Sequence, residues 1–206
     1  MREVSSENLL HLGQAAGEAA GEAGGEREAR MGVAVRIAAA TDGRTLHEVA
    51  AATFALACPP GTQQEQIDVF IAEHLSEERF HDYLADENRE LFIVENDGNA
   101  VGYTMLVYGE PADGDVLASI TTLPTVELSK LYLLASQHGT GAAAELMTAT
   151  INAARQRDVA SMWLGVNQLN ERANRFYQKN GFSLVGTKRF RVGEELHDDF
   201  VRECVF

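Results

Sequence analysis

The sequence is poor in cysteine, in long apolar runs and in basic residues. Its 206 residues include two cysteines and one tryptophan, and 31 acidic side chains outnumber 17 basic ones. Cys58 and Cys204 stand far apart, and neither belongs to a Cys-x-x-Cys or Cys/His cluster. A disulfide framework or a zinc site is therefore not indicated. Both cysteines are expected to be reduced thiols of a cytoplasmic protein.

The charge balance and the missing apolar runs narrow the possible functions. A net charge of −14 argues against nucleic acid as the main partner, because phosphate binding needs a basic face. It argues equally against an anionic membrane surface. No apolar run approaches the ~18 residues of a membrane span, and the N-terminus lacks the pattern of a secretory signal.

What remains is the composition of one globular domain preceded by a tail. An apolar fraction of 45% and a charged fraction of 23% are typical of a soluble globule, and the length predicts a single domain. Residues 1–32 are rich in Ala, Gly and Glu, with no large apolar residue between Leu12 and Met31. This segment is predicted to be a flexible tail, and residues 33–206 the domain.

Apolar periodicity and turn signals predict the elements of the domain. Strands are expected at 33–39, 91–95, 100–108, 125–134, 161–166, 183–192 and 198–206, with at most one short strand in 110–122. Helices are expected at 46–57 with Asp42 as N-cap, and at 63–74, 76–85, 141–157 and 170–180. The order predicts a mixed α/β (α+β) domain, with one mostly antiparallel sheet flanked by helices.

The first segment that can carry chemistry joins strand 125–134 to the next helix. Small residues from Gly139 to Ala144 form a tight turn, and the helix begins directly after it. Unpaired N–H groups at the start of a helix form an anion site suited to a pyrophosphate. An ordinary strand-to-helix loop explains this segment equally well. It is neither a P-loop, which ends in Gly-Lys-Ser/Thr, nor a dinucleotide fingerprint, whose spacing fails here.

The second segment is the predicted helix at 170–180. Asn170, Ala173 and Tyr177 have the spacing i, i+3 and i+7, which places an amide, a small side chain and a phenol on one helix face. The alternative is an amphipathic helix whose aromatic residues Phe176 and Tyr177 belong to the core. Helical spacing alone favours that alternative.

Together the two segments resemble the GNAT family of N-acetyltransferases, which move an acetyl group from acetyl-CoA to an amine. The loop corresponds to His138-Gly139-Thr140-Gly141-Ala142-Ala143. The helix motif matches at Asn170, Ala173, Phe176, Tyr177, Gly181 and Phe182. The resemblance follows the element order of residues 33–206 and is specific from Glu127 to Phe182. It implies a single domain of that fold, with acetyl-CoA as co-substrate and no metal.

The resemblance also implies roles for particular residues. Tyr177 is the expected general acid for the departing thiolate, and a backbone N–H near Leu133 the expected oxyanion donor. The expected cofactor contacts come from Leu131, Tyr132, Leu133, His138, Gly139, Thr140, Gly141, Ala142, Ala143, Asn170, Ala173 and Tyr177. The family usually has Gln or Arg where His138 stands, so backbone N–H groups are expected to hold the diphosphate.

Glu127 is the expected general base, acting through water. Strict strand alternation would place it on the same face as Ser129, Leu131 and Leu133. The alternative is an ion-paired or surface carboxylate on the strand.

The acceptor is expected to be a cationic amine. Trp163-Leu164-Gly165-Val166 and the final hairpin look most like the branch of PaiA-type spermidine/spermine acetyltransferases. A polyamine-like small molecule and a protein lysine remain alternatives, and a homodimer is open by analogy. The acceptor entrance has two candidate acidic groups, for which plain solvation is the alternative: Glu194, Glu195, Asp198 and Asp199, and Glu77, Glu78, Asp82, Asp86 and Glu87. A competing function is a non-catalytic acyl-CoA sensor on the same fold.

Overall fold

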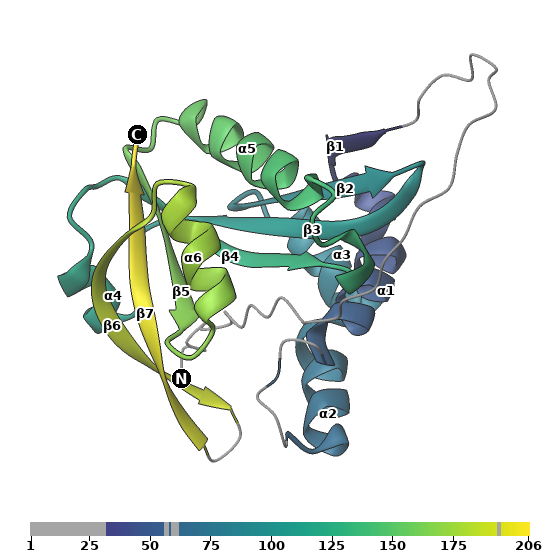
Figure 1. The fold of residues 1–206 in the computed structure, drawn as a ribbon, viewed down its shortest axis with the longest axis horizontal. Coiled ribbons are helices and arrows are strands. Elements are labelled where there is room, and N and C mark those ends of the chain that lie inside the picture. Colours follow the sequence, from purple (N-terminus) through teal and green to yellow (C-terminus); the bar gives the residue numbers. More distant parts are fainter. Residues whose placement is uncertain (1–31, 56–57, 59–61, 193–194) are drawn as a thin grey trace.

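The sheet is built from strands far apart in the chain. The computed structural model describes residues 32–55, 58, 62–192 and 195–206, so the predicted tail lies outside the described residues except for Gly32. The strands are β1 (Val33–Ile37), β2 (Arg89–Asn96), β3 (Asn99–Tyr108), β4 (Thr125–Leu133), β5 (Ser161–Asn167), β6 (Ser183–Val192) and β7 (Glu195–Val205). They form one seven-stranded sheet in the order β1-β2-β3-β4-β5-β7-β6 (Figure 1).

The helices cover both faces of this sheet. They are α1 (Gly43–Phe54), α2 (Gln64–His74), α3 (Glu77–Ala85), α4 (Gly114–Ser119), α5 (Ala142–Arg155) and α6 (Glu171–Lys179), with short 3₁₀ turns η1 (Ala40–Asp42) and η3 (Ala135–Gln137). One apolar core joins α5 and α6 to β2–β5. A second joins α1, α2 and α3 to the opposite side of β2–β4. The predicted mixed, mostly antiparallel sheet flanked by helices is confirmed, because only β4 and β5 run parallel.

Local chemistry explains several element boundaries. The turn between β2 and β3 has positive φ angles at Asp97 (52°) and Gly98 (77°), as a tight hairpin turn requires. The Ser76 hydroxyl caps α3 by accepting a hydrogen bond from the Arg79 N–H at 3.3 Å.

The predicted N-cap position of Asp42 is confirmed, although its side chain does not cap the helix, and the short strand that the sequence allowed in 110–122 is absent. Asp42 stands at the N-cap position of α1, but its carboxylate accepts from the Ala39 N–H and pairs with Arg36, both at 2.6 Å, and does not cap the helix. Segment 110–122 contains α4 and no strand. The Asp113 carboxylate caps α4 by accepting from the N–H of Asp115 at 2.9 Å. The sequence allowed a short strand in this acidic segment with Pro and Gly, whereas Val116 is the buried residue of a six-residue helix.

A bulge in β4 overturns the predicted face of Glu127. The β3–β4 register shifts so that Met105 pairs with Lys130 and Leu106 with Leu128, which leaves Ser129 without an opposite residue. Val126, Leu128, Leu131 and Leu133 consequently all belong to the core beneath α5. Glu127 therefore lies on the opposite face, together with Lys130 and Tyr132.

Candidate active site

Strands β4 and β5 are paired only at their beginnings. Thr125, Val126 and Glu127 are opposite Ser161, Met162 and Trp163, and no pairing continues beyond them. β4 remains paired with β3, and β5 with β7, so the two central strands diverge toward their carboxyl ends. The predicted loop and the predicted helix lie on either side of this divergence, as Figure 1 shows.

The backbone of β4 presents N–H groups to the divergence. The Leu134 N–H donates to the Val101 carbonyl on β3 at 2.8 Å. Successive N–H groups along a strand point to opposite edges. The Leu133 N–H is therefore directed away from β3, toward the side where β5 has left the sheet. This is the position at which a backbone oxyanion donor was predicted.

The loop before α5 has the shape of an anion site. Gly139 and Gly141 have φ angles of 83° and 92°, and no heavy atom lies within 4 Å of the Cβ that either would carry. Both positions favour glycine, and both leave space beside the backbone. The Thr140 hydroxyl donates to the Gln137 carbonyl at 2.8 Å and so fixes the turn. α5 begins at Ala142, which is fully buried, while Ala143 beside it is partly exposed.

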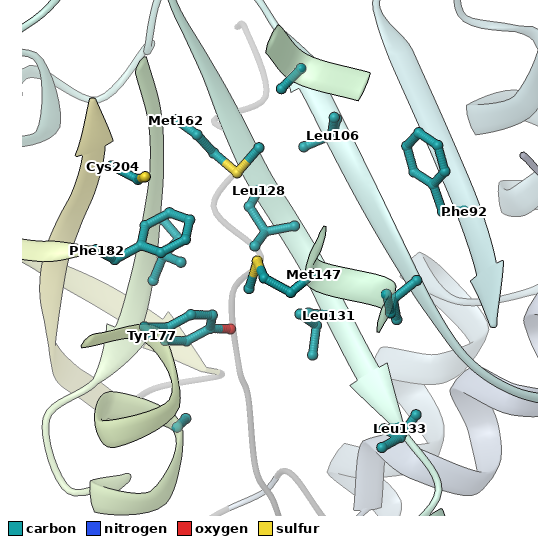
Figure 2. Packing of buried hydrophobic residues seen from close by; sticks show 14 of the residues in the cluster. Phe92, Leu106, Leu128, Leu131, Leu133, Met147, Met162, Tyr177, Phe182 and Cys204 are labelled. Atoms are coloured by element: carbon teal, nitrogen blue, oxygen red, sulfur yellow. The ribbon is translucent and has the colours of Figure 1, made fainter. Parts of the chain in front are cut away.

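Tyr177 occupies the inner face of α6. Its side chain is fully buried, and its hydroxyl makes no hydrogen bond with any part of the chain that the structure describes. Figure 2 shows this hydroxyl pointing from α6 toward the side of β4 that carries Leu131. Burial raises the pKa of Tyr177 well above its ordinary value, and the nearby Tyr132 adds to the rise. The phenol therefore keeps its proton at neutral pH.

Asn170 and Ala173 begin the same helix. The Asn170 side-chain oxygen caps α6 by accepting from the Ala173 N–H at 3.0 Å. Its amide nitrogen is buried and makes no hydrogen bond with the described residues, so it remains a donor for a ligand. Ala173 is 1% exposed and belongs to the core beneath α5 and α6. The three predicted residues of this motif are thus gathered on the buried side of α6.

Glu127 lies where β4 and β5 are still paired. Its Cα is opposite those of Val107 and Trp163, and it lines a cavity of about 110 Å³ together with Trp163, Glu110 and Asp113. This cavity opens on the face of α1–α4, whereas Tyr177 approaches from the face of α5 and α6. If Glu127 is the base, it therefore acts from one face of the sheet, and Tyr177 acts from the other.

Sequence reasoning missed three cations beside the loop. Arg172, Arg175 and Lys179 line a cavity of about 450 Å³ whose other wall includes Gly139 and Gly141. The spacing i, i+3 and i+7 places the three on one face of α6 and was available as a signal. The motif residues Asn170, Ala173 and Tyr177 have the same spacing on another face of the helix, and only that face was interpreted as a binding face.

Sequence reasoning named Asp199 as a candidate acid but missed that it is buried next to Lys188. Lys188 on β6 and Asp199 on β7 are opposite each other in the sheet, and are 3% and 1% exposed. The Lys188 ammonium lies 5.6 Å from the centre of the Trp163 ring. Burial raises the pKa of Asp199 to about 7, against the attraction of Lys188. Plain solvation, the alternative for the acidic residues of the final hairpin, therefore does not apply to Asp199. Asp198 is exposed and is consistent with it.

The described residues show no group of three or more His, Cys, Asp or Glu side chains able to hold a metal ion. None of the helices described is long and apolar enough to cross a membrane. Cys58 and Cys204 are free, and burial raises the pKa of Cys58 to about 11, which disfavours a reactive thiolate.

Known proteins are similar to this chain in sequence. The profile of the acetyltransferase (GNAT) family matches residues 55–182. An uncharacterised N-acetyltransferase of Mycobacterium tuberculosis is 46% identical over 167 residues, which cover 80% of this chain and 99% of that protein.

Solved structures agree on the fold. The PaiA N-acetyltransferase of Thermoplasma acidophilum, solved in complex with coenzyme A, has a TM-score of 0.67 at 20% identity, over 85% of this chain and 100% of that one. A ribosomal-protein-alanine N-acetyltransferase of Brucella melitensis has a TM-score of 0.63 at 20% identity, over 84% and 99%. The chain belongs to the acetyltransferase (GNAT) family and is an acetyl-CoA-dependent N-acetyltransferase.

Proposed function

We propose that this enzyme transfers the acetyl group of acetyl-CoA directly to a cationic primary amine, with Tyr177 as the general acid. The observation that carries the proposal is the Tyr177 hydroxyl, which is buried, protonated and without a hydrogen bond to the described residues. A buried hydroxyl of this kind is costly unless a ligand supplies its partner. The thiolate leaving acetyl-CoA in the divergence between β4 and β5 is such a partner.

The residues around the divergence divide the work of the reaction. The loop N–H groups and the start of α5 hold the diphosphate, while Asn170 offers its amide to the pantetheine arm. The neutral amine attacks the thioester carbon, and the Leu133 N–H donates to the oxyanion that forms. When the C–S bond breaks, Tyr177 supplies the proton that the sulfur takes up. The nitrogen that has formed the amide bond loses its extra proton, and the Tyr177 phenolate regains a proton by way of solvent.

Glu127 is the proposed base for the proton that the acceptor ammonium must lose, and a water carries that proton to it. Water transfer fits the position of Glu127 in a cavity on the acceptor face, at the last paired position of β4 and β5. The carboxylates of Glu110 and Asp113 line the same cavity and favour a cationic acceptor.

Two acceptor classes follow from this chemistry, a polyamine-like small molecule and a protein lysine. The similarity of the fold to that of the PaiA N-acetyltransferase favours the polyamine-like small molecule. We further propose that the enzyme is located in the cytoplasm. A homodimer is a further sequence-based prediction, to be tested by light scattering in solution.

The test is thiol release from acetyl-CoA, measured with a panel of amines and a panel of lysine peptides. Release that depends on one acceptor class, and falls at least a hundredfold in Tyr177→Phe, supports the proposal. Tight CoA binding without release for any acceptor would instead support a non-catalytic acyl-CoA sensor. A parallel series with longer acyl donors would reveal a preference for a different acyl group.

A further inference from the structure

The histidine in the cofactor loop has a specific contact. Nδ1 of His138 lies 3.2 Å from Nη1 of Arg172, across the gap between the loop and α6. A guanidinium carries donors and no acceptor, so this contact is a hydrogen bond only if Nδ1 carries a lone pair. The geometry therefore assigns His138 the neutral tautomer protonated on Nε2. In this form it accepts a hydrogen bond from Arg172.

Arg172 also faces the space that a diphosphate would fill. It lines the cavity of about 450 Å³ that Gly139 and Gly141 bound on the other side. Arg175, on the same face of α6, is already paired with Glu171 at 3.0 Å on the exposed side. Arg172 is instead half-buried and tied to the loop itself.

We propose that Arg172 binds the diphosphate of acetyl-CoA, and that His138 is a positioning residue holding the guanidinium beside the start of α5. The inference rests on the proposed function, because it requires CoA to occupy this cavity. A guanidinium has five N–H donors, so one that donates to His138 can also donate to phosphate oxygens. The cation that the loop lacks at position 138 is thus supplied by α6.

This arrangement answers a difficulty that the net charge creates. A protein with a charge of −14 repels a cofactor that carries several negative charges. Arg172 provides a local positive charge where screening by solvent is reduced. It also links the diphosphate to the helix that carries Tyr177, so that binding of the cofactor orders the acid relative to the thioester.

The experiment is calorimetric titration of the full chain and its variants with three ligands: CoA, dephospho-CoA and pantetheine. Arg172→Ala is expected to weaken CoA and dephospho-CoA equally, by about ten- to a hundredfold, because both carry the diphosphate. Pantetheine, which lacks phosphates, should bind the variant and the wild type alike. Arg44→Ala is the charge-matched control, since Arg44 is an exposed residue of α1 paired with Glu48. It should leave all three affinities unchanged.

The other outcomes overturn the inference. Unchanged CoA affinity would exclude Arg172, and a loss confined to CoA would assign it to the 3′-phosphate. An equal loss for pantetheine would indicate damage to α6. If the wild type binds no CoA, it is the proposed function that fails. Arg172→Gln, which keeps a long helix-forming side chain, replaces the alanine variant if that variant does not fold, and should show the same ligand pattern.

The positioning role of His138 is tested by variants that remove or keep the hydrogen-bond acceptor for Arg172. His138→Leu removes the acceptor and should weaken CoA about three- to tenfold, whereas His138→Gln keeps an acceptor and should restore most of the affinity. In the Arg172→Ala background, His138→Leu should have little further effect, because a positioning residue has nothing left to position. Additive losses would show that His138 binds the cofactor independently. Both Arg172 variants should also reduce the salt dependence of CoA binding.

Discussion

The hydroxyl of Tyr177 differs from those of Tyr108 and Tyr83. The hydroxyl of Tyr108 donates to Glu90 at 2.8 Å, and that of Tyr83 to the His74 carbonyl at 3.2 Å. Tyr177 is buried and has no such partner among the described residues. A polar group left in this state inside a core needs an explanation, and the proposed function supplies one, the departing thiolate.

Tyr177→Phe is therefore expected to lower kcat by roughly a hundredfold or more, with little change in CoA affinity, since only the transition state needs the proton. Steady-state kinetics together with calorimetry would check this split. Tyr83→Phe removes a hydroxyl of the same kind far from the divergence and serves as the control. A kcat equal to that of the wild type would remove Tyr177 from the mechanism.

Glu127→Gln tests the proposed base. The loss of kcat/KM should be largest near neutral pH and should shrink as the pH rises, because the free amine then forms without help. A pH–rate profile measures this directly. A loss of the same size at every pH would show that Glu127 only supports the cavity. Asp113 lines that cavity too, but Asp113→Asn would also remove the cap of α4, so Glu110→Gln is the better control.

At the scale of elements, the start of α5 depends on one backbone conformation. Gly141 is its N-cap and has a left-handed φ of 92°. Any other residue pays about 1–2 kcal/mol for that conformation. Gly141→Ala should therefore lower Tm by roughly 2–8 °C in a chain of this size.

The same change should weaken CoA binding, because a methyl group would enter space that the cofactor backbone contact requires. Calorimetric scans and CoA titrations measure the two effects. Gly114→Ala is the matched control, since Gly114 has free space around its Cβ position and no left-handed φ. A stable Gly141→Ala with normal CoA affinity would contradict the anion-site interpretation of the loop.

The sequence predicts the elements better than it predicts their faces. Helix and strand positions follow from periodicity, and the loop and helix motifs locate the site because their chemistry is local. The face of Glu127 was wrong because one bulge residue, Ser129, reverses the alternation and leaves no mark in the sequence pattern. The contact of Arg172 with His138 and the burial of Asp199 beside Lys188 were missed for a related reason. Periodicity places Arg172 on a face of α6, but it does not show which side chain of another element lies opposite either residue.

At the scale of the whole molecule, Asp199 links stability to pH. Its pKa is raised to about 7 by burial, with Lys188 opposing the rise and Asp198 adding to it. The folded state therefore holds this proton between pH ~4 and ~7, where the unfolded state has already lost it. The folded protein binds more protons in this window, so its stability falls as the pH rises through it.

Asp199→Asn imitates the protonated form and should remove this dependence. The variant is expected to gain stability over the wild type from pH 5 to pH 8, by up to about 4 kcal/mol, which is the limit set by a shift of three pKa units. Denaturant unfolding at both pH values measures the difference. Asp198→Asn, on the exposed neighbour, should show almost none of it. A difference that is constant between pH 5 and pH 8 would mean that Asp199 stays ionised throughout.

The bulge at Ser129 divides β4 into two parts with opposite parity. Before the bulge, the odd-numbered side chains of β4 lie on the acceptor face, and after it the even-numbered side chains lie there. Glu127 and Tyr132 are therefore on the same side of the sheet. Removing Ser129 itself would leave the other side chains of β4 on their present faces, because Ser129 is the residue without a partner on β3. Pairing all the present residues without a bulge would instead act as a switch of faces. Leu131 and Leu133 would turn toward the acceptor, and Lys130 and Tyr132 toward the core beneath α5. The bulge at Ser129 therefore decides which residues of β4 face the acceptor and which pack beneath α5.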